Sequence, residues 1–84
     1  MDIKVLGIGC AKCKKLYEEV EKAIREVDTN ATLTKVEKLD EIISYRVLMT
    51  PALVINGEVK SAGRIPPYSE IAGWITTAAE EKQG

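Results

Sequence analysis

The sequence predicts an α/β fold in which a four-stranded mixed sheet packs against helices, in the order β-α-β-α-β-β-α. Three observations predict it. The chain opens with a strand, helix, strand pattern, which requires a parallel strand pair. Asn56-Gly57, a strong hairpin signal, joins two later strands and makes them antiparallel. The chain closes with apolar residues at helical spacing. Its 84 residues give room for one compact domain, spanning residues 1–84.

The first three elements are a strand, a long helix and a second strand. Residues 3–6 are rich in apolar side chains and run into Gly7 and Gly9, which predicts a short strand ending in a turn. From Cys13 onward a helix is predicted, because apolar residues recur at helical spacing among charged ones. These apolar positions are Leu16, Val20, Ala23, Ile24 and Val27. Residues 31–37 are rich in β-branched side chains, which predicts the second strand.

The middle of the chain predicts a short helix and a buried strand. The helix covers residues 39–46, with Asp40 as its expected cap. Thr50-Pro51 then requires an extended Thr50, because the proline ring clashes with a helical residue before it. The apolar run at residues 52–55 follows as a strand that is buried on both faces.

The last third of the chain predicts a hairpin strand and a closing helix. Residues 58–62 carry charged side chains, which is typical of an edge strand. Pro66-Pro67 is expected to begin the helix, and a polar tail at residues 80–84 is expected to follow it. The apolar face of this helix consists of Ile71, Trp74, Ile75 and Ala78. We interpret Trp74 as a packing residue, and Tyr17 and Tyr68 as half-buried aromatics.

Composition excludes several classes of function. The 12 basic and 13 acidic residues give a net charge of −1, which argues against a protein that wraps a nucleic-acid duplex. No apolar run approaches the roughly 20 residues of a membrane span, and we expect no membrane partner and a cytoplasmic protein. The sequence contains no histidine, so Ser-His-Asp triads and histidine metal sites are impossible within one chain.

The chemistry of the chain lies in two cysteines, Cys10 and Cys13, at the junction of the first strand and the first helix. A helix N-terminus carries unpaired N–H groups and partial positive charge, which favour a thiolate on Cys10. Cys10 is therefore the expected nucleophile. Cys13, one turn into the helix and more enclosed, is the expected resolving thiol. We expect Lys12 to lower the pKa of the Cys10 thiol, although a solvated helix end is the alternative reading of this lysine.

The same cysteines also suit a soft metal ion. The segment from Gly7 to Cys13 resembles the G-M-x-C-x-x-C loop of heavy-metal-associated copper chaperones, and two thiolates can hold Cu(I) linearly. Those domains have the order β-α-β-β-α-β and end on a strand, whereas this chain is expected to end on a helix. Ile8 also stands where they have methionine. A thiolate metal carrier is therefore the alternative function, and no resident metal is predicted.

Taken together, the motifs resemble the thioredoxin/glutaredoxin superfamily, and most closely its small archaeal and bacterial redox-active disulfide proteins. The shared features are a C-x-x-C after the first strand, Thr50-Pro51 before a buried strand, the Asn56-Gly57 hairpin, and a glycine before a closing helix. The resemblance covers nearly the whole chain and implies a thioredoxin-like fold. It implies a thiol-disulfide oxidoreductase with a redox-active Cys10-Cys13 disulfide and no bound cofactor.

The resemblance also assigns roles outside the cysteines. Pro51 takes the place of a cis-proline beside the disulfide, and Gly9, Met49, Thr50 and Pro51 are the expected substrate contacts. The implied partners are disulfide-containing proteins, with a flavin-dependent thioredoxin reductase or glutathione as electron donor, and the implied state is a monomer. A third reading is a binding module whose disulfide no cellular reductase turns over. One departure stands out, because we find no acidic residue in an apolar strand to assist the resolving cysteine.

Overall fold

The computed structural model describes residues 1–9, 11–27 and 30–83. Within these ranges the chain forms four strands and three helices. In chain order they are β1 (Asp2–Leu6), α1 (Ala11–Val27), β2 (Thr32–Val36), α2 (Leu39–Ser44), β3 (Ala52–Ile55), β4 (Glu58–Ala62) and α3 (Tyr68–Gln83). This is the predicted order, and the predicted α/β class is confirmed.

The sheet has the strand order β2-β1-β3-β4. β1 pairs parallel with β2, and β3 pairs antiparallel with both β1 and β4, so the mixed sheet is confirmed. Asn56 and Gly57 form the β3–β4 turn with φ of 51° and 82°, the positive values that the hairpin signal required. β4 lies at an edge of the sheet, and all four residues of β3 are buried, both as predicted.

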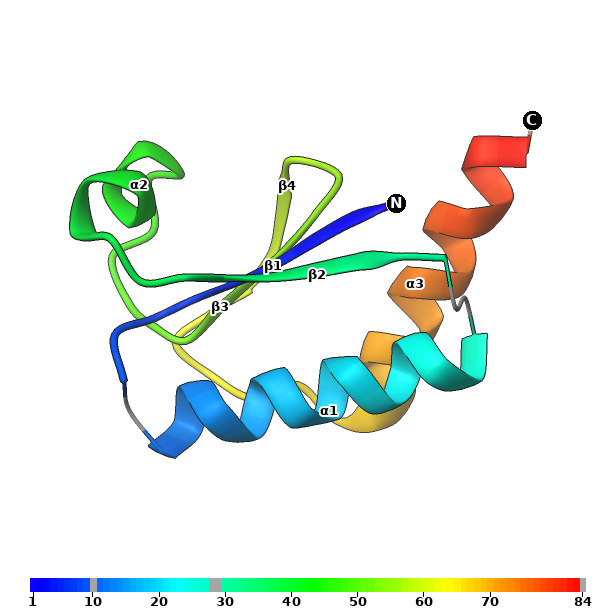
Figure 1. Ribbon diagram of the computed structural model, residues 1–84, viewed down its shortest axis with the longest axis horizontal. Helices are drawn as coiled ribbons and strands as arrows, with labels where there is room; N and C mark the ends of the chain where they lie inside the picture. Colours follow the sequence, from blue (N-terminus) through cyan, green and yellow to red (C-terminus); the bar gives the residue numbers. More distant parts are fainter. Residues whose placement is uncertain (10, 28–29, 84) are drawn as a thin grey trace.

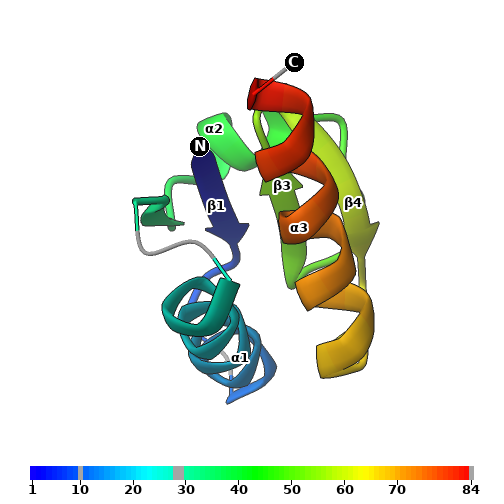
Figure 2. The ribbon, with the colours of Figure 1, turned by 90° about the vertical axis from the view of Figure 1, so that its right-hand side faces the viewer.

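α1 and α3 cover one face of the sheet. Their apolar residues meet Ile3, Val5, Leu53 and Ile55 from the two central strands in the larger core cluster. The helical members of this cluster are Leu16, Val20, Ala23, Ile24, Ile71, Ile75 and Ala78. Figure 1 shows α1 along the bottom of the molecule with the strands above it, and Figure 2 shows α3 running alongside β3 and β4.

α2 covers the opposite face over a smaller core cluster. Ile42 is the buried residue of this helix, and it packs with Leu6, Val36, Ala52 and Val54 from the strands. In Figure 1 α2 lies at the upper left, on the other side of the strands from α1. The two faces of the sheet are thus covered by helices of very different length, 17 and 16 residues against 6.

Two sequence predictions about helix ends are wrong. α3 continues to Gln83 instead of ending before a tail at residues 80–84, because Ala, Glu, Lys and Gln are strong helix formers even without an apolar face. Asp40 does not cap α2. The N-cap position is Lys38, which makes no side-chain cap hydrogen bond, and Asp40 lies in the first turn, where a carboxylate interacts favourably with the helix dipole.

Packing of the aromatic residues agrees with their interpretation from sequence. Trp74, Tyr17 and Tyr68 are each partly buried against the larger core cluster.

Among the described residues, no helix combines the length and the apolar character needed to cross a bilayer.

Candidate functional site

The candidate site lies where β1 ends and α1 begins. Cys13 is in the first turn of α1, is 8% exposed and is disulfide-bonded. Cys13 is thus buried, and that it is the more enclosed of the two thiols stays a prediction. Cys10, the predicted nucleophile, lies outside the described residues. Lys12 is exposed on the first turn of α1, and Gly9 is exposed with φ of 56°.

Gly7 makes room for the sulfur of Cys13. Its amide donates a hydrogen bond of 3.0 Å to the Val36 carbonyl, which continues the pairing of β1 with β2 by one residue. A methyl group on Gly7 would overlap Cys13 Sγ, lie 3.1 Å from Cys13 Cβ, and lie 3.7 Å from Thr50 Cβ. Three segments that are distant in sequence therefore converge at the buried cysteine: the end of β1, the start of α1 and the segment before β3.

The Thr50-Pro51 peptide bond is cis, as predicted. Pro51 is fully buried, and its carbonyl accepts a hydrogen bond of 2.9 Å from the Gly63 amide. Thr50 is exposed. The residue before the proline is thus presented at the surface next to the buried Cys13, while the proline itself is held from the side of β4. A contact between Pro51 and the cysteine sulfurs stays a prediction.

Met49 covers the other end of this segment. Its side chain is 63% exposed and lies over Gly63, with Met49 Sδ and Cε each 3.3 Å from the position a Gly63 Cβ would take. Gly63 has φ of 79°, a conformation that L residues rarely adopt. Thr50 thus lies beside Gly7 and Met49 beside Gly63, and the role of Met49, Thr50 and Pro51 as substrate contacts stays a prediction.

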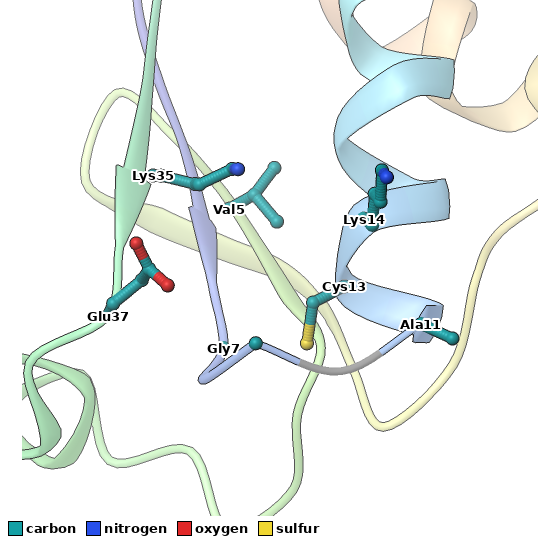
Figure 3. A pocket seen from close by; sticks show the side chains of 8 residues that line it. Val5, Gly7, Ala11, Cys13, Lys14, Lys35 and Glu37 are labelled. Atoms are coloured by element: carbon teal, nitrogen blue, oxygen red, sulfur yellow. The ribbon is translucent and has the colours of Figure 1, made fainter.

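A pocket of about 190 Å³ lies beside Cys13, between β2 and the first turn of α1. Figure 3 shows the side chains that line it. Its lining residues are Val5, Gly7, Gly9, Ala11, Cys13, Lys14, Lys35 and Glu37. Sequence reasoning missed Lys35 and Glu37. The signal that would have found them is the parallel register, which pairs Val5 with Lys35 and so brings the end of β2 to the end of β1.

On the other side of Thr50 the surface is apolar. An apolar groove of about 360 Å³ runs between α2 and the segment before β3, and it is lined by Ile8, Leu39, Ile42, Ile43, Val47, Leu48 and Thr50. Leu48 is 98% exposed, and Ile8, Leu39 and Ile43 are each about 60% exposed. No residue of this lining is charged. Exposed apolar side chains gathered around a hollow are typical of a protein interaction site.

Two further observations concern charged groups. Arg64, which follows Gly63, forms an ion pair of 2.8 Å with Glu70. Within the described ranges, no group of three or more Cys, Asp and Glu side chains is arranged to hold a metal ion.

Comparison with known proteins gives one family. A family model described as a thioredoxin domain matches residues 1–76. A protein of Methanothermobacter thermautotrophicus named thioredoxin is 32% identical over 71 residues, covering 84% of this chain and 92% of the relative. A second protein named thioredoxin, from Methanocaldococcus jannaschii, is 34% identical over 80 residues, covering 95% of this chain and 92% of the relative.

Proposed function

Because the chain belongs to the thioredoxin family, we propose that it is a thiol-disulfide oxidoreductase that works through the dithiol of Cys10 and Cys13. One observation carries the proposal: Cys13 is buried in the first turn of α1, against Gly7 and beside the exposed Thr50 that precedes the cis-proline. Disulfide exchange with a polypeptide requires that the substrate chain be held at an exposed backbone segment beside the reacting sulfurs, and Thr50 is such an exposed residue.

The reaction proceeds in two exchanges. In the first, the Cys10 thiolate attacks a substrate disulfide, forms a mixed disulfide, and one substrate thiolate leaves. In the second, the Cys13 thiolate attacks the sulfur of Cys10, the Cys10-Cys13 disulfide forms, and the second substrate thiolate leaves. The substrate gains two electrons and two protons in total, and the protein dithiol loses them. The chain's own disulfide is the redox group, and no bound cofactor is required.

Each predicted site residue has a place in this scheme. Thr50 offers its backbone to an extended substrate segment, and the buried Pro51 fixes the position of that backbone. In this proposal Gly9 and Met49 complete the substrate contact. Lys12, in the first turn of α1, favours the Cys10 thiolate by its positive charge.

The apolar groove supports protein disulfides as the substrate class. Its lining includes Ile8, two residues before Cys10, and Thr50, so in this proposal a polypeptide bound at Thr50 also contacts the groove. Its uncharged lining suits an apolar side chain near the substrate cysteine. The electron donor in this proposal is a flavin-dependent thioredoxin reductase or glutathione, and the protein acts as a cytoplasmic monomer, without nucleic-acid or membrane partners.

A redox titration tests the proposal. The protein is equilibrated in dithiothreitol or glutathione buffers, and free thiols are counted at each potential. We expect one two-electron transition between a dithiol and an intramolecular disulfide, and failure to form that disulfide would end the proposal.

An assay that couples the protein to reductases from the same cell then identifies the electron donor. It also addresses the third reading, because a binding module would not be reduced by any of them.

The alternative, a thiolate copper carrier, uses the same two sulfurs. In this chain α2 stands between β2 and β3, whereas the copper chaperones that the Gly7–Cys13 segment resembles have the order β-α-β-β-α-β. The two functions are separated by purifying the reduced protein without oxygen and measuring its copper and zinc. Stoichiometric and tightly held Cu(I) would favour the carrier.

A further inference from the structure

Met49 presents a thioether sulfur at the surface, in the segment before β3. Its side chain is 63% exposed, and the residue directly precedes Thr50 and the cis-proline. The sequence has one other methionine, Met1, whose side chain is partly buried against the larger core cluster. Oxidation of a side-chain sulfur by a dissolved oxidant follows its exposure. Met49 is therefore the methionine that such an oxidant reaches first.

Gly63 supports the Met49 sulfur. The Met49 side chain lies across Gly63, with its Cβ, Sδ and Cε at 2.9, 3.3 and 3.3 Å from the position that a Gly63 Cβ would take. A side chain at residue 63 would displace these atoms. The Gly63 amide in turn donates a hydrogen bond of 2.9 Å to the Pro51 carbonyl. The thioether thus rests on a backbone that is itself bonded to the proline of the candidate site.

The surface around the Met49 sulfur is apolar. Met49 lines a hollow of about 390 Å³ between the segment before β3 and β4, and this hollow shares Leu48 with the apolar groove. β4 contributes Val59 and Ala62 to it. Arg46 is the one charged side chain in its described lining. An oxygen atom on the sulfur of Met49 would therefore bring a polar group into a surface that suits apolar side chains of a partner.

We propose that Met49 is an oxidation site for peroxides, and that its oxidation weakens the recognition of protein disulfides. The inference rests on the proposed function. The thioether sulfur attacks one oxygen of hydrogen peroxide, the O–O bond breaks, and that oxygen stays on the sulfur as a sulfoxide. The other oxygen leaves as water. The sulfur loses two electrons and the peroxide gains them, so the step balances without any further reactant.

The disulfide form of the protein is the form in which Met49 reacts. Peroxides oxidise cysteines as thiolates, and Cys13 in its disulfide offers no thiolate. The exposed thioether of Met49 has no such protection. Peroxide therefore changes the surface beside Thr50 while the cysteine sulfurs stay available for later reduction. A polypeptide that contacts this surface binds less well, whereas a small disulfide that does not reach it is reduced at the usual rate.

Peroxide treatment of the disulfide form tests the proposal. The protein is incubated with hydrogen peroxide, catalase removes the excess, and peptide mapping by mass spectrometry follows the sulfoxide on each methionine. We expect Met49 to be oxidised at least about fivefold faster than Met1, because Met49 is the more exposed. After dithiothreitol has reduced the disulfide, kcat/KM for a protein disulfide should be at least about fivefold lower than in untreated protein. The rate with a small aromatic disulfide should be unchanged.

Two variants complete the experiment. Met49→Leu keeps an apolar side chain without the sulfur, so its rate with the protein disulfide, whatever its starting value, should be the same before and after peroxide. Adding Val27→Met to Met49→Leu places an exposed thioether at the last residue of α1. This double variant should be oxidised at residue 27 and should keep its rate.

Three results would each overturn the inference. They are equal oxidation of Met49 and Met1, a Met49 sulfoxide that leaves the reduction of the protein disulfide unchanged, and a loss of rate in Met49→Leu as large as in the unaltered protein. If the untreated protein reduces neither disulfide, the proposed function fails instead. The sulfoxide mapping does not depend on activity, so the two failures are distinguishable.

Discussion

Cys13 lies so close to Gly7 that no side chain fits between them: a Cβ on Gly7 would overlap the sulfur of Cys13. Gly7 does not have a positive φ, so its backbone conformation does not require a glycine. The close approach of the Cys13 sulfur does. The end of β1 and the first turn of α1 are in direct contact through these two residues. The position of the buried sulfur is thus fixed by the backbone that directly follows β1.

Gly7→Ala should destabilise the protein by about 1–3 kcal/mol, because an added methyl group in a packed site forces its neighbours to move. Urea denaturation of the oxidised protein measures the change. Gly73→Ala is the matched control. Gly73 lies within α3 with nothing within 4 Å of its Cβ position, so this substitution should stabilise by about 0.5–1 kcal/mol. Equal effects of the two substitutions would contradict the overlap at Cys13.

The two cysteines should fail differently when each is replaced by serine. Cys10→Ser removes the attacking thiolate and should abolish exchange, whereas Cys13→Ser should attack a disulfide and then accumulate a covalent mixed disulfide. Mass spectrometry after incubation with a protein disulfide detects the adduct.

In the reduced protein, a short iodoacetamide pulse near neutral pH should label Cys10 before Cys13. Label found mainly on Cys13, or equally on both, would reverse the two roles.

Leu48, the most exposed apolar residue of the apolar groove, should contribute to recognition of protein substrates. Leu48→Ser should lower kcat/KM for a protein disulfide at least about tenfold, because burying a leucine contributes about 1.5–3 kcal/mol and about 1.4 kcal/mol is tenfold in affinity. A small disulfide that does not reach the groove should be reduced at the usual rate. Val27→Ser, at the last residue of α1, removes an exposed apolar side chain elsewhere and should change neither rate.

Tyr68 should report the contact between α1 and α3. Its hydroxyl donates a hydrogen bond of 2.8 Å to the Glu26 carboxylate, and this bond, with burial and the negative charge of Glu26, raises the pKa of Tyr68 above 10.0. Because the folded-state pKa of Tyr68 is raised, its hydrogen bond to Glu26 contributes to the stability of the fold. This contribution is fully present below pH 10 and is lost as the pH rises through the folded-state pKa. Glu26→Gln should lower the pKa of Tyr68, measured by NMR titration of its ring. An unchanged pKa would show that the bond does not form in solution.

Most of the fold was predictable because local signals and the sheet agree. The strand–helix–strand opening, the hairpin at Asn56-Gly57 and the buried run at residues 52–55 each indicate the same mixed sheet, and the structure has it. The end of α3 was not predictable from periodicity, since residues 80–83 continue the helix through intrinsic propensity without an apolar stripe. Asp40 resembled a cap because acidic residues favour both the cap position and the first turn.

The candidate site was predictable where it lies in one motif and missed where it depends on register. Cys13, Thr50 and Pro51 belong to short motifs whose spacing is visible in the sequence. Lys35 lies in β2 and Glu37 directly follows that strand, and only the pairing of β2 with β1 brings them to the pocket beside Cys13. The apolar groove was missed for a related reason. Its residues come from the turn after β1, from α2 and from the segment before β3, which no sequence window contains together.

The unequal helix layers have a consequence for motion. α2 has 6 residues and one buried side chain, Ile42, so its local opening exposes little apolar surface and leaves the core under α1 and α3 intact. Native-state hydrogen exchange should find the α2 amides opening at a lower free energy than those of β1 and β3, and uniform protection would contradict this. The candidate site lies between α2 and the more stable core under α1 and α3. The side of the site that carries Cys13 should therefore keep its shape. The side that carries Leu39 and Ile43, on α2, can adapt to partners of different shape.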